Sequence, residues 1–432
     1  MKKIRIALMG LGNVGMGVWI ILYSNKKEIM KRSGYEIEIG KILVKDKNKE
    51  REIDIPDDVI TTDINDILED DSIKIVVEVM GGIEPAREYI LKCMDRKKHI
   101  VTANKMLIAT DGDRLFHKAD SMGVMFNYEA SVAGGIPIIN GIEESLTANK
   151  IRELYGIVNG TTNYILTKMQ LERMDFDVAL KQAQDMGYAE ADPTSDVEGF
   201  DAQYKLAILS SLAFGTKIDV NSVYREGITK IQSTDIKYAR KFDMVIKMLA
   251  IAKDSDGKLE LRVHPTMIPK EHPLANVYDS FNAIFIKGNA VGDLMFYGRG
   301  AGSLPTGSAV VGDIISMLRN NVDIENSNPV VKNNLWDREI MDIGQSESKF
   351  YIRVNVLDRS GVLGEITTIL GRYNVSLRSV IQKGDENSKG EVTIIMITHR
   401  TKQADIDAAV KEIVSLESVI KIDNIIRIED FR

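Results

Sequence analysis

Five carboxylates and one lysine gather within residues 190–205, near the middle of the chain. They are Glu190, Asp192, Asp196, Glu198, Asp201 and Lys205. The Asp-Pro and Thr-Ser pairs at 192–195 predict a turn, and a helix is expected to begin near residues 199–201. On that helix Asp201 and Lys205 are four residues apart, so they share a face and can pair. Such groups suit acid–base chemistry, but a solvated acidic loop with a surface ion pair fits the same pattern.

Histidine and cysteine offer few other candidate catalytic or metal-binding groups. The five histidines stand at positions 99, 117, 264, 272 and 399, and no two have a metal-ligand spacing such as H-E-x-x-H. Cys93 is the one cysteine, so neither an internal disulfide nor a cysteine-rich metal site can form, and a reducing cytoplasm is expected. Catalysis is therefore expected to use carboxylates, lysines and backbone groups.

The composition is that of a globular protein. Of the 432 residues 44% are hydrophobic and 28% charged, which excludes a mostly disordered chain, and at about 150 residues per domain the length predicts about three domains. The net charge of −7 argues against nucleic-acid or anionic-membrane binding. Glycines interrupt the apolar N-terminal stretch and no small-residue cleavage site follows, which argues against a signal peptide. No other stretch is long enough to span a bilayer.

The first segment is typical of a nucleotide-binding unit. Residues 4–9 predict a strand, followed by Gly10, Gly12 and Gly15, a helix to about residue 32 and a second strand at 36–44. Gly10 permits a tight turn, Gly12 lets backbone approach a pyrophosphate, and Gly15 lets helix and strand pack closely. The strand and helix on either side favour dinucleotide binding over a simple turn.

The turn after the second strand gives a mixed signal about the cofactor. Lys45 and Lys47 suit the extra phosphate of NADP, whereas Asp46 suits the ribose hydroxyls of NAD. A charged, solvated turn fits any one of them equally well.

Two further strands end in loops that could contact a cofactor. The apolar run at 73–79 predicts a buried parallel strand that leads into Met80 and Gly81, and the strand at 99–102 leads from Thr102 into Lys105. Ligands of doubly wound sheets sit beyond the carboxyl ends of the strands, where both loops fall. Lys105 is either an ordinary surface lysine or a group beside the cofactor, and its position favours the second interpretation.

The loop at 129–137 follows a strand expected at 124–128. Small residues and two glycines allow several backbone carbonyls to turn toward one point, as a hard cation requires. A plain tight loop is the better interpretation from these residues alone.

The motifs together resemble one family. The pattern A-x3-G-Y-A-x2-D-P-x2-D-V-x-G-x-D-x3-K at 183–205 resembles the signature of homoserine dehydrogenases throughout its length. The resemblance extends to G-L-G-N-V-G at 10–15, V-E-V-M-G-G at 77–82, T-A-N-K at 102–105, Y-E-A-S-V-A-G-G-I-P at 128–137, N-G-T-T-N at 159–163 and G-R-G-A-G-x3-T-G-S-A-V at 298–310. It covers about residues 1–325.

The resemblance implies reversible hydride transfer between a nicotinamide cofactor and L-aspartate 4-semialdehyde, giving L-homoserine in threonine, methionine and isoleucine biosynthesis. It implies that Lys205 is the proton donor and acceptor, that Asp201 orients it, and that Lys105 helps to position substrate or cofactor. Glu190 and Asp196 would bind polar groups of the substrate. The implied cofactor is NADP, with NAD as the alternative.

The same resemblance implies two ligand sets. The cofactor-binding residues would be Gly10, Gly12, Asn13, Val14, Gly15, Lys45, Met80, Gly81, Thr102, Lys105 and Gly302. A structural sodium ion would be held mainly by backbone oxygens of Glu129, Val132, Gly134 and Ile136.

The tail has the pattern of a separate module. Residues 331–348 are polar and weakly patterned, as in a linker, and residues 349–432 predict the order βαββαβ of a ferredoxin-like fold. The sequence L-D-R-S-G-V-L-G-E-I-T-T-I-L resembles the first strand-to-helix turn of ACT domains. By resemblance Asp358 and Gly361 would bind a small amino acid, with L-threonine the expected effector. An ACT domain used only for assembly is the alternative.

The expected architecture is therefore α/β with three parts. Residues 1–135 form a Rossmann-type doubly wound sheet completed by a return helix at about 305–330, residues 136–304 form an α+β substrate and dimerisation domain, and the ACT domain follows. A homodimer or homotetramer in the cytoplasm is expected. The alternative function is a catalytically silent, amino-acid-sensing nucleotide-binding regulator, which would be expected to have lost Lys205 or Asp201. An ACT-bearing phosphoglycerate-type dehydrogenase would be expected to use a His–carboxylate pair, for which no histidine is an evident candidate.

Overall fold

The computed structural model describes residues 2–51, 54–320, 336–383 and 390–431. The described chain forms two compact units, which share the helix α10 (Phe200–Phe214) because the division falls between Gln203 and Tyr204. The first unit comprises Met1–Arg152, Tyr204–Asn221 and Asn282–Asp337, and the second comprises Glu153–Gln203, Ser222–Phe281 and Arg338–Arg432. None of the helices in the described ranges is long and apolar enough to cross a membrane.

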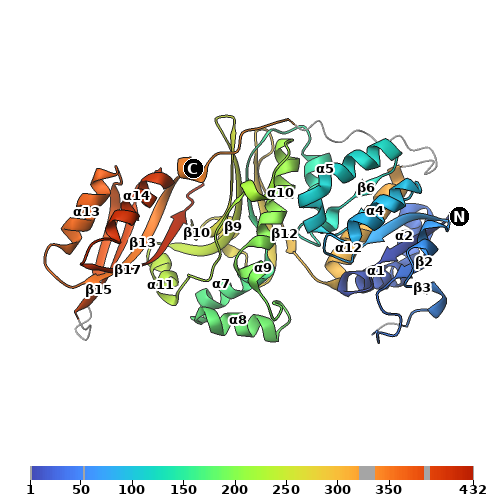
Figure 1. Ribbon diagram of the computed structural model, residues 1–432, viewed down its shortest axis with the longest axis horizontal. Coiled ribbons are helices and arrows are strands. Elements are labelled where there is room, and N and C mark those ends of the chain that lie inside the picture. Colours follow the sequence, from blue (N-terminus) through green and yellow to red (C-terminus); the bar gives the residue numbers. More distant parts are fainter. Residues whose placement is uncertain (1, 52–53, 321–335, 384–389, 432) are drawn as a thin grey trace. The chain divides into compact units, whose positions relative to one another are not determined.

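The first unit is built on a parallel sheet of six strands in the order β3-β2-β1-β4-β5-β6. The strand order reverses beside β1, which is the position where doubly wound sheets bind ligands. The strands are β1 (Lys2–Met9), β2 (Tyr35–Leu43), β3 (Ile60–Thr61), β4 (Ile73–Glu78), β5 (His99–Thr102) and β6 (Phe126–Asn127). The helices around the sheet are α1 (Asn13–Ser24), α2 (Lys26–Ser33), α3 (Asn65–Leu68), α4 (Ala86–Asp95), α5 (Lys105–Met122) and α12 (Ser303–Asn320) (Figure 1).

The predicted doubly wound sheet is confirmed, with one difference in the first helix. The helix expected to run to about residue 32 is two helices, because the backbone leaves helical geometry at Asn25 (φ −103°, ψ 16°). The return helix begins at Ser303 and packs against α1, and the rest of its expected range, 321–330, lies outside the described residues. The first unit also contains α6 (Ile138–Asn140), a π-helical turn (Gly141–Ser145), and the neighbouring strands β11 (Phe281–Gly288) and β12 (Gly292–Arg299).

The second unit is built on strands β7 (Ile151–Ile157), β9 (Met244–Ser255), β10 (Lys258–Pro269), β17 (Val419–Ile428), β13 (Glu347–Leu357), β15 (Glu391–Thr398) and β14 (Leu377–Lys383), which neighbour one another in that order. β9 and β10 form a long antiparallel hairpin, and β17 joins β10 in parallel through the pairs Thr266–Arg427 and Met267–Ile428. The C-terminal sheet is therefore continuous with the hairpin. The short strands β8 (Tyr224–Arg225) and β16 (Thr401–Lys402) pair with β10 and β13.

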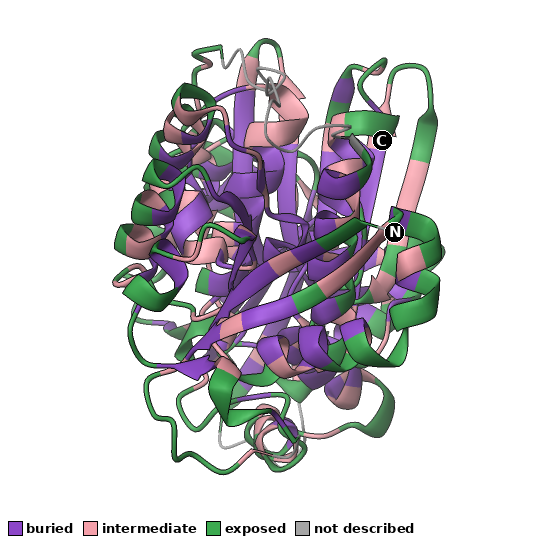
Figure 2. Ribbon diagram, turned by 90° about the vertical axis from the view of Figure 1, so that its right-hand side faces the viewer, coloured by how far each residue is buried: buried purple, intermediate pink, exposed green. Residues whose placement is uncertain are grey.

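In Figure 2, the strands of the first unit are largely buried and its helices are exposed on their outer sides. Helices also cover the strands of the second unit, whose core residues are buried. They are α7 (Gly160–Glu172), α8 (Phe176–Asp185), α9 (Thr194–Val197), α11 (Ser233–Lys241), α13 (Val362–Arg372) and α14 (Gln403–Ile413). The C-terminal elements follow the order β13, α13, β14, β15, α14, β17, which confirms the predicted ferredoxin-like module. A core of its own fills it, with Phe350, Ile366 and Ile406 fully or almost fully buried. Of the polar segment 385–390, residues 385–389 lie outside the described residues, and so do residues 331–335 of the expected linker. The rest of that linker, residues 336–348, is described and includes a short 3-10 turn at Ile343–Gln345.

Candidate active site

The glycine turn after β1 has the geometry that dinucleotide binding needs. Gly10 has φ +109° and donates its amide to the carbonyl of Leu43 at 2.9 Å. A Cβ at Gly15 would lie 2.4 Å from the Gly10 carbonyl oxygen, so only glycine lets α1 start this close to the turn. At Gly12 a Cβ would meet nothing within 4 Å, which leaves space beside the N-terminus of α1, where Asn13 and Val14 stand.

A buried carboxylate, Glu78, organises the next two loops. Its Oε2 accepts the Thr102 hydroxyl at 2.6 Å, and its Oε1 accepts the amides of Met80 and Gly81 at 2.8 and 3.2 Å. Asn104 caps α5 and donates Nδ2 to the Gly82 carbonyl at 2.6 Å. Burial raises the pKa of the Glu78 carboxyl.

These contacts tie the M-G-G and T-A-N-K loops into one unit at the carboxyl edge of the sheet. Lys105 is the first residue of α5 and is half-buried there. The sequence reasoning missed Glu78 and Asn104 as organising residues, although both lie within motifs that it singled out.

The return loop reaches the first helix directly. Gly302 has φ +119°, and the Ser303 hydroxyl donates to the Asn13 carbonyl at 2.7 Å. A Cβ at Gly17 would lie 2.1 Å from the Ser303 carbonyl oxygen, so α1 and α12 are in backbone contact. Gly302 thus lies next to the glycine turn, as a cofactor contact requires.

The charged turn after β2 is exposed. Lys45 and Asp46 both face solvent, and Asp46 Oδ1 accepts the Asn48 amide at 2.8 Å. The Arg51 guanidinium, which the sequence reasoning did not consider, donates to the carbonyls of Asp46 and Lys49 at 2.7 and 2.8 Å and shapes this turn.

The loop expected to hold a cation is buried and tightly curled. Ala133 and Gly134 have φ +56° and +44°, and a Cβ at Gly134 would lie 2.6 Å from the Gly300 carbonyl oxygen. The Ile136 carbonyl oxygen accepts the Ile138 amide at 2.8 Å, and its second lone pair could still bind a cation. The Glu129 carboxylate accepts the amides of Ile139 and Asn140 at 2.9 and 2.8 Å, so it stabilises the loop from inside.

Within the described ranges, no cluster of three or more His, Cys, Asp or Glu side chains could hold a metal ion. Any cation at the curled loop would therefore depend on backbone oxygens, such as those of Val132 and Gly134.

In the second unit, Asn159 joins two of the predicted site carboxylates. Its Nδ2 donates to Asp196 Oδ1 at 2.6 Å and to Asp201 Oδ2 at 2.8 Å, while its Oδ1 accepts the Thr162 amide at 2.8 Å and caps α7. Asn159 and Asp201 are almost completely buried. The amide lies in the N-G-T-T-N motif, but nothing in the sequence alone shows that it reaches both carboxylates.

The helix α10 begins at Phe200 and carries both Asp201 and Lys205, which confirms the predicted helix. Lys205 is only 8% exposed, so the alternative interpretation, an ordinary surface ion pair, does not hold for it. Glu190 differs from these residues: its side chain is exposed, and its carbonyl accepts the Gln184 side chain at 3.1 Å.

In the C-terminal module, the turn between β13 and α13 lines a cavity of about 280 Å³. Gly361 has φ +95° and caps α13, and Asp358 is exposed beside it. Gly364 and Gln382 also line this cavity.

A parallel sheet with a glycine turn at its reversal point, joined to a ferredoxin-like module, defines a nucleotide-binding protein of the dehydrogenase type with an ACT tail. Three family models match the chain: homoserine dehydrogenase, NAD binding domain, at residues 10–129; homoserine dehydrogenase at 137–315; and ACT domain at 350–418. The homoserine dehydrogenase of Bacillus subtilis is 39% identical, with 99% of each chain covered. The chain belongs to the homoserine dehydrogenase family.

Solved structures support the same family assignment. A homoserine dehydrogenase from Thiobacillus denitrificans matches with a TM-score of 0.93 at 42% identity, covering 100% of this chain and 99% of that one. A hyperthermophilic archaeal homoserine dehydrogenase in complex with NADPH matches with a TM-score of 0.61 at 27% identity, covering 73% of this chain and 97% of that one.

Proposed function

We propose that this chain catalyses the reversible interconversion of L-aspartate 4-semialdehyde and L-homoserine with NADP, or alternatively NAD. The observation that carries the proposal is the buried link from Asn159 to Asp196 and Asp201, at the start of the helix that bears the buried Lys205. Membership in the homoserine dehydrogenase family supports the same reaction. A silent regulator would have no need for a buried lysine one turn from a buried carboxylate.

Lys205 is proposed to hold the proton that moves during the reaction. Its ammonium donates a proton to the carbonyl oxygen of the semialdehyde in one direction, and its amine accepts the hydroxyl proton of homoserine in the other. A positive group at this oxygen also stabilises the charge that develops on it. Asp201, one helical turn earlier, orients Lys205. When bound, the nicotinamide supplies or takes up the hydride.

The amino-acid end of the substrate carries an α-ammonium. Asp196 and Glu190 are proposed to bind it and to orient the reacting carbon. Lys105, at the N-terminus of α5, is proposed to position substrate or cofactor beside the sheet edge. An absorbance assay of the nicotinamide with homoserine as substrate tests the reaction, and no turnover with either NADP or NAD would refute it.

The cofactor is proposed to lie over the glycine turn, with Gly10, Gly12 and Gly15 beside the pyrophosphate and Gly81, Thr102 and Gly302 around the rest. Space beside Gly12 and Gly81, where a Cβ would meet nothing within 4 Å, fits such a ligand. Exposed Lys45 favours NADP through its extra phosphate. Lys45→Ala should raise the KM for NADP and leave that for NAD unchanged; equal changes would refute this assignment.

Sodium is proposed as a structural ion on the carbonyls of Glu129, Val132, Gly134 and Ile136. The buried, left-handed turn at Ala133–Gly134 supports the proposal because it curls the backbone. Thermal midpoints in sodium, compared with those in choline at equal ionic strength, test it. Equal midpoints would count against the ion.

L-Threonine is proposed as an effector at Asp358 and Gly361, and the chain as a homodimer or homotetramer. The cavity beside Gly361, at the start of α13, suits a carboxylate because the N-terminus of a helix presents amide donors. Titration of activity and of molar mass with threonine tests both statements. An unchanged rate and mass over a wide threonine range would leave assembly as the module's role.

A further inference from the structure

A loop of the second unit, residues 224–230, lies against the helix that carries Asp196; it is called the clamp loop below. Its Ile228 amide donates to the Val197 carbonyl at 2.8 Å, and the Thr229 hydroxyl donates to Glu198 Oε1 at 3.0 Å. The Arg225 guanidinium donates to the Glu198 carbonyl. Three bonds therefore fix the end of α9 directly after Asp196.

Gly227 shows how closely the clamp loop approaches α9. A Cβ there would lie 2.6 Å from both the Val197 carbonyl oxygen and Glu198 Oε2, so the two backbones are in contact. The Glu226 amide donates to the Val263 carbonyl at 2.8 Å, which ties the loop to β10 as well. A shift of the clamp loop would therefore be transmitted to α9.

The C-terminal module holds the clamp loop from the other side. Arg427 on β17 donates Nη1 to Glu226 Oε2 at 2.9 Å, Nη2 to Tyr224 Oη at 3.0 Å and Nε to Gln403 Oε1 at 2.9 Å. Asn424 Nδ2 donates to the Lys230 carbonyl at 3.1 Å. Arg427 and Asn424 are each only 5% exposed, so water screens these bonds little.

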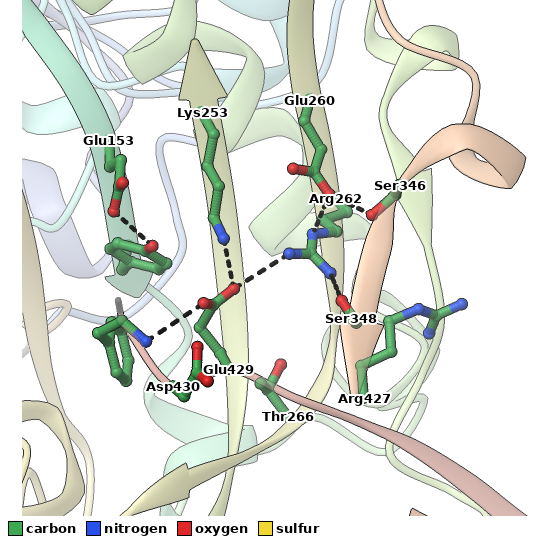
Figure 3. A network of polar contacts seen from close by, with 12 residues as sticks. Glu153, Lys253, Glu260, Arg262, Thr266, Ser346, Ser348, Arg427, Glu429 and Asp430 are labelled. Carbon is green, nitrogen blue, oxygen red and sulfur yellow. Dashed lines mark hydrogen bonds and ion pairs between the residues drawn. The ribbon is translucent and has the colours of Figure 1, made fainter. Parts of the chain in front are cut away.

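β17 is itself firmly attached to the hairpin of the second unit (Figure 3). Glu429, one residue beyond β17, accepts Arg262 Nη2 at 3.1 Å and Lys253 Nζ at 2.5 Å, and Arg262 donates to the Ser348 hydroxyl at 3.0 Å. The strand that carries Arg427 thus has a fixed position relative to β9 and β10.

We propose that Arg427 and Asn424 are positioning residues for Asp196: they hold the clamp loop, which holds α9. The inference rests on the proposed binding of the substrate by Asp196. It gives the C-terminal module a part in forming the substrate site even when no effector is bound. A structural role alone would change the amount of folded protein, whereas a positioning role changes the affinity for homoserine.

The test uses full-length Arg427→Met and Glu226→Gln, which remove the same ion pair from opposite sides. We expect the KM for homoserine to rise about tenfold in each, with the KM for the cofactor changed by less than about twofold. Arg427→Lys keeps one charged contact and should restore part of the affinity. Arg372→Met is the matched control, because exposed Arg372 pairs with Glu412 and not with the clamp loop; its KM values should stay unchanged.

Asp196→Asn separates the two proposals. If it raises the KM for homoserine while folded Arg427→Met and Glu226→Gln do not, the clamp-loop proposal is wrong and the role of Asp196 stands. If Asp196→Asn leaves that KM unchanged, the role of Asp196 is wrong and the positioning proposal falls with it. Should Arg427→Met fail to fold, Glu226→Gln decides, since it keeps the shape of the side chain.

Discussion

Replacing Asn159 tests whether the buried carboxylate pair needs its amide donor. Asn159→Ser and Asn159→Asp both keep an oxygen that can cap α7, as Asn159 Oδ1 does through the Thr162 amide. Both remove the Nδ2 group that donates to Asp196 at 2.6 Å and to Asp201 at 2.8 Å. The aspartate variant also places a third carboxylate beside these two.

The size of the effect follows from the two lost bonds. A hydrogen bond to a charged group contributes about 1.5–3 kcal/mol net, and about 1.4 kcal/mol corresponds to tenfold. The loss of both bonds therefore gives about a 100-fold loss in kcat/KM for homoserine in Asn159→Ser. Water that replaces the Nδ2 group would make this loss smaller. Asn159→Asp should lose more, because like charges repel in a buried site.

The aspartate variant also has a pH signature. Crowding three carboxylates raises the pKa of the cluster in the folded state, so the folded chain binds more protons than the unfolded one. Its loss of stability relative to wild type should therefore shrink as the pH falls.

Steady-state kinetics and urea unfolding at several pH values measure both effects. Asn149→Asp is the matched control, because Asn149 accepts the Val291 amide at 2.8 Å through an oxygen that aspartate also has. Its kcat/KM should equal that of wild type. A folded Asn159→Asp variant with wild-type kcat/KM would refute the reasoning.

Three further outcomes are expected. Gly17→Val should lower the thermal midpoint by the equivalent of about 1–3 kcal/mol, because a Cβ at this position would lie 2.1 Å from the Ser303 carbonyl oxygen. Gly12→Ala should leave the midpoint unchanged and weaken cofactor binding, because a Cβ there would meet nothing within 4 Å. Equal midpoints for the two variants would contradict this. Burial lowers the pKa of Lys247 from 10.5 to about 7. Between about pH 7 and pH 10 the unfolded chain therefore binds one proton more than the folded chain, and the stability of the wild type should rise with pH over this range. The urea midpoint of Lys247→Met should lack that rise. Burial raises the pKa of the Cys93 thiol to about 12. The thiol of the native protein should therefore react with Ellman's reagent at least about 100-fold more slowly than that of the unfolded protein. Equal rates would contradict this and show that the surroundings of Cys93 open readily.

Local patterns predicted the elements of the fold well. Glycines that follow an apolar strand predicted the turn at Gly10, and β-type runs predicted five of the six parallel strands and the C-terminal βαββαβ order, because both signals are local in the chain. The two-residue strand β3 was not predicted, since it is too short to show a pattern. The break at Asn25 was missed, since the residues on both sides favour a helix. The parallel pairing of β17 with β10 joins residues about 160 positions apart, from Thr266–Arg427, and no local pattern contains it.

The candidate site shows the same division. Spacing on one helix was enough to place Asp201 and Lys205 on one face, and the four-residue interval is a local property. The Asn159 link spans 37 residues to Asp196 and 42 to Asp201, and the Glu78–Thr102 bond spans 24. Tertiary packing determines such contacts, and they leave no periodic pattern in a single sequence from which they could be predicted.

The most direct test of the account is the turnover of Lys205→Ala with homoserine. Removing a positioned proton donor should lower kcat by about 100- to 10,000-fold, with the cofactor dissociation constant, measured by nicotinamide fluorescence, changed by less than about twofold. Lys217→Ala, which removes an exposed pair with Asp113 at 2.7 Å, should turn over like wild type. A folded Lys205→Ala variant with near-normal kcat and unchanged substrate binding would contradict the assignment of Lys205.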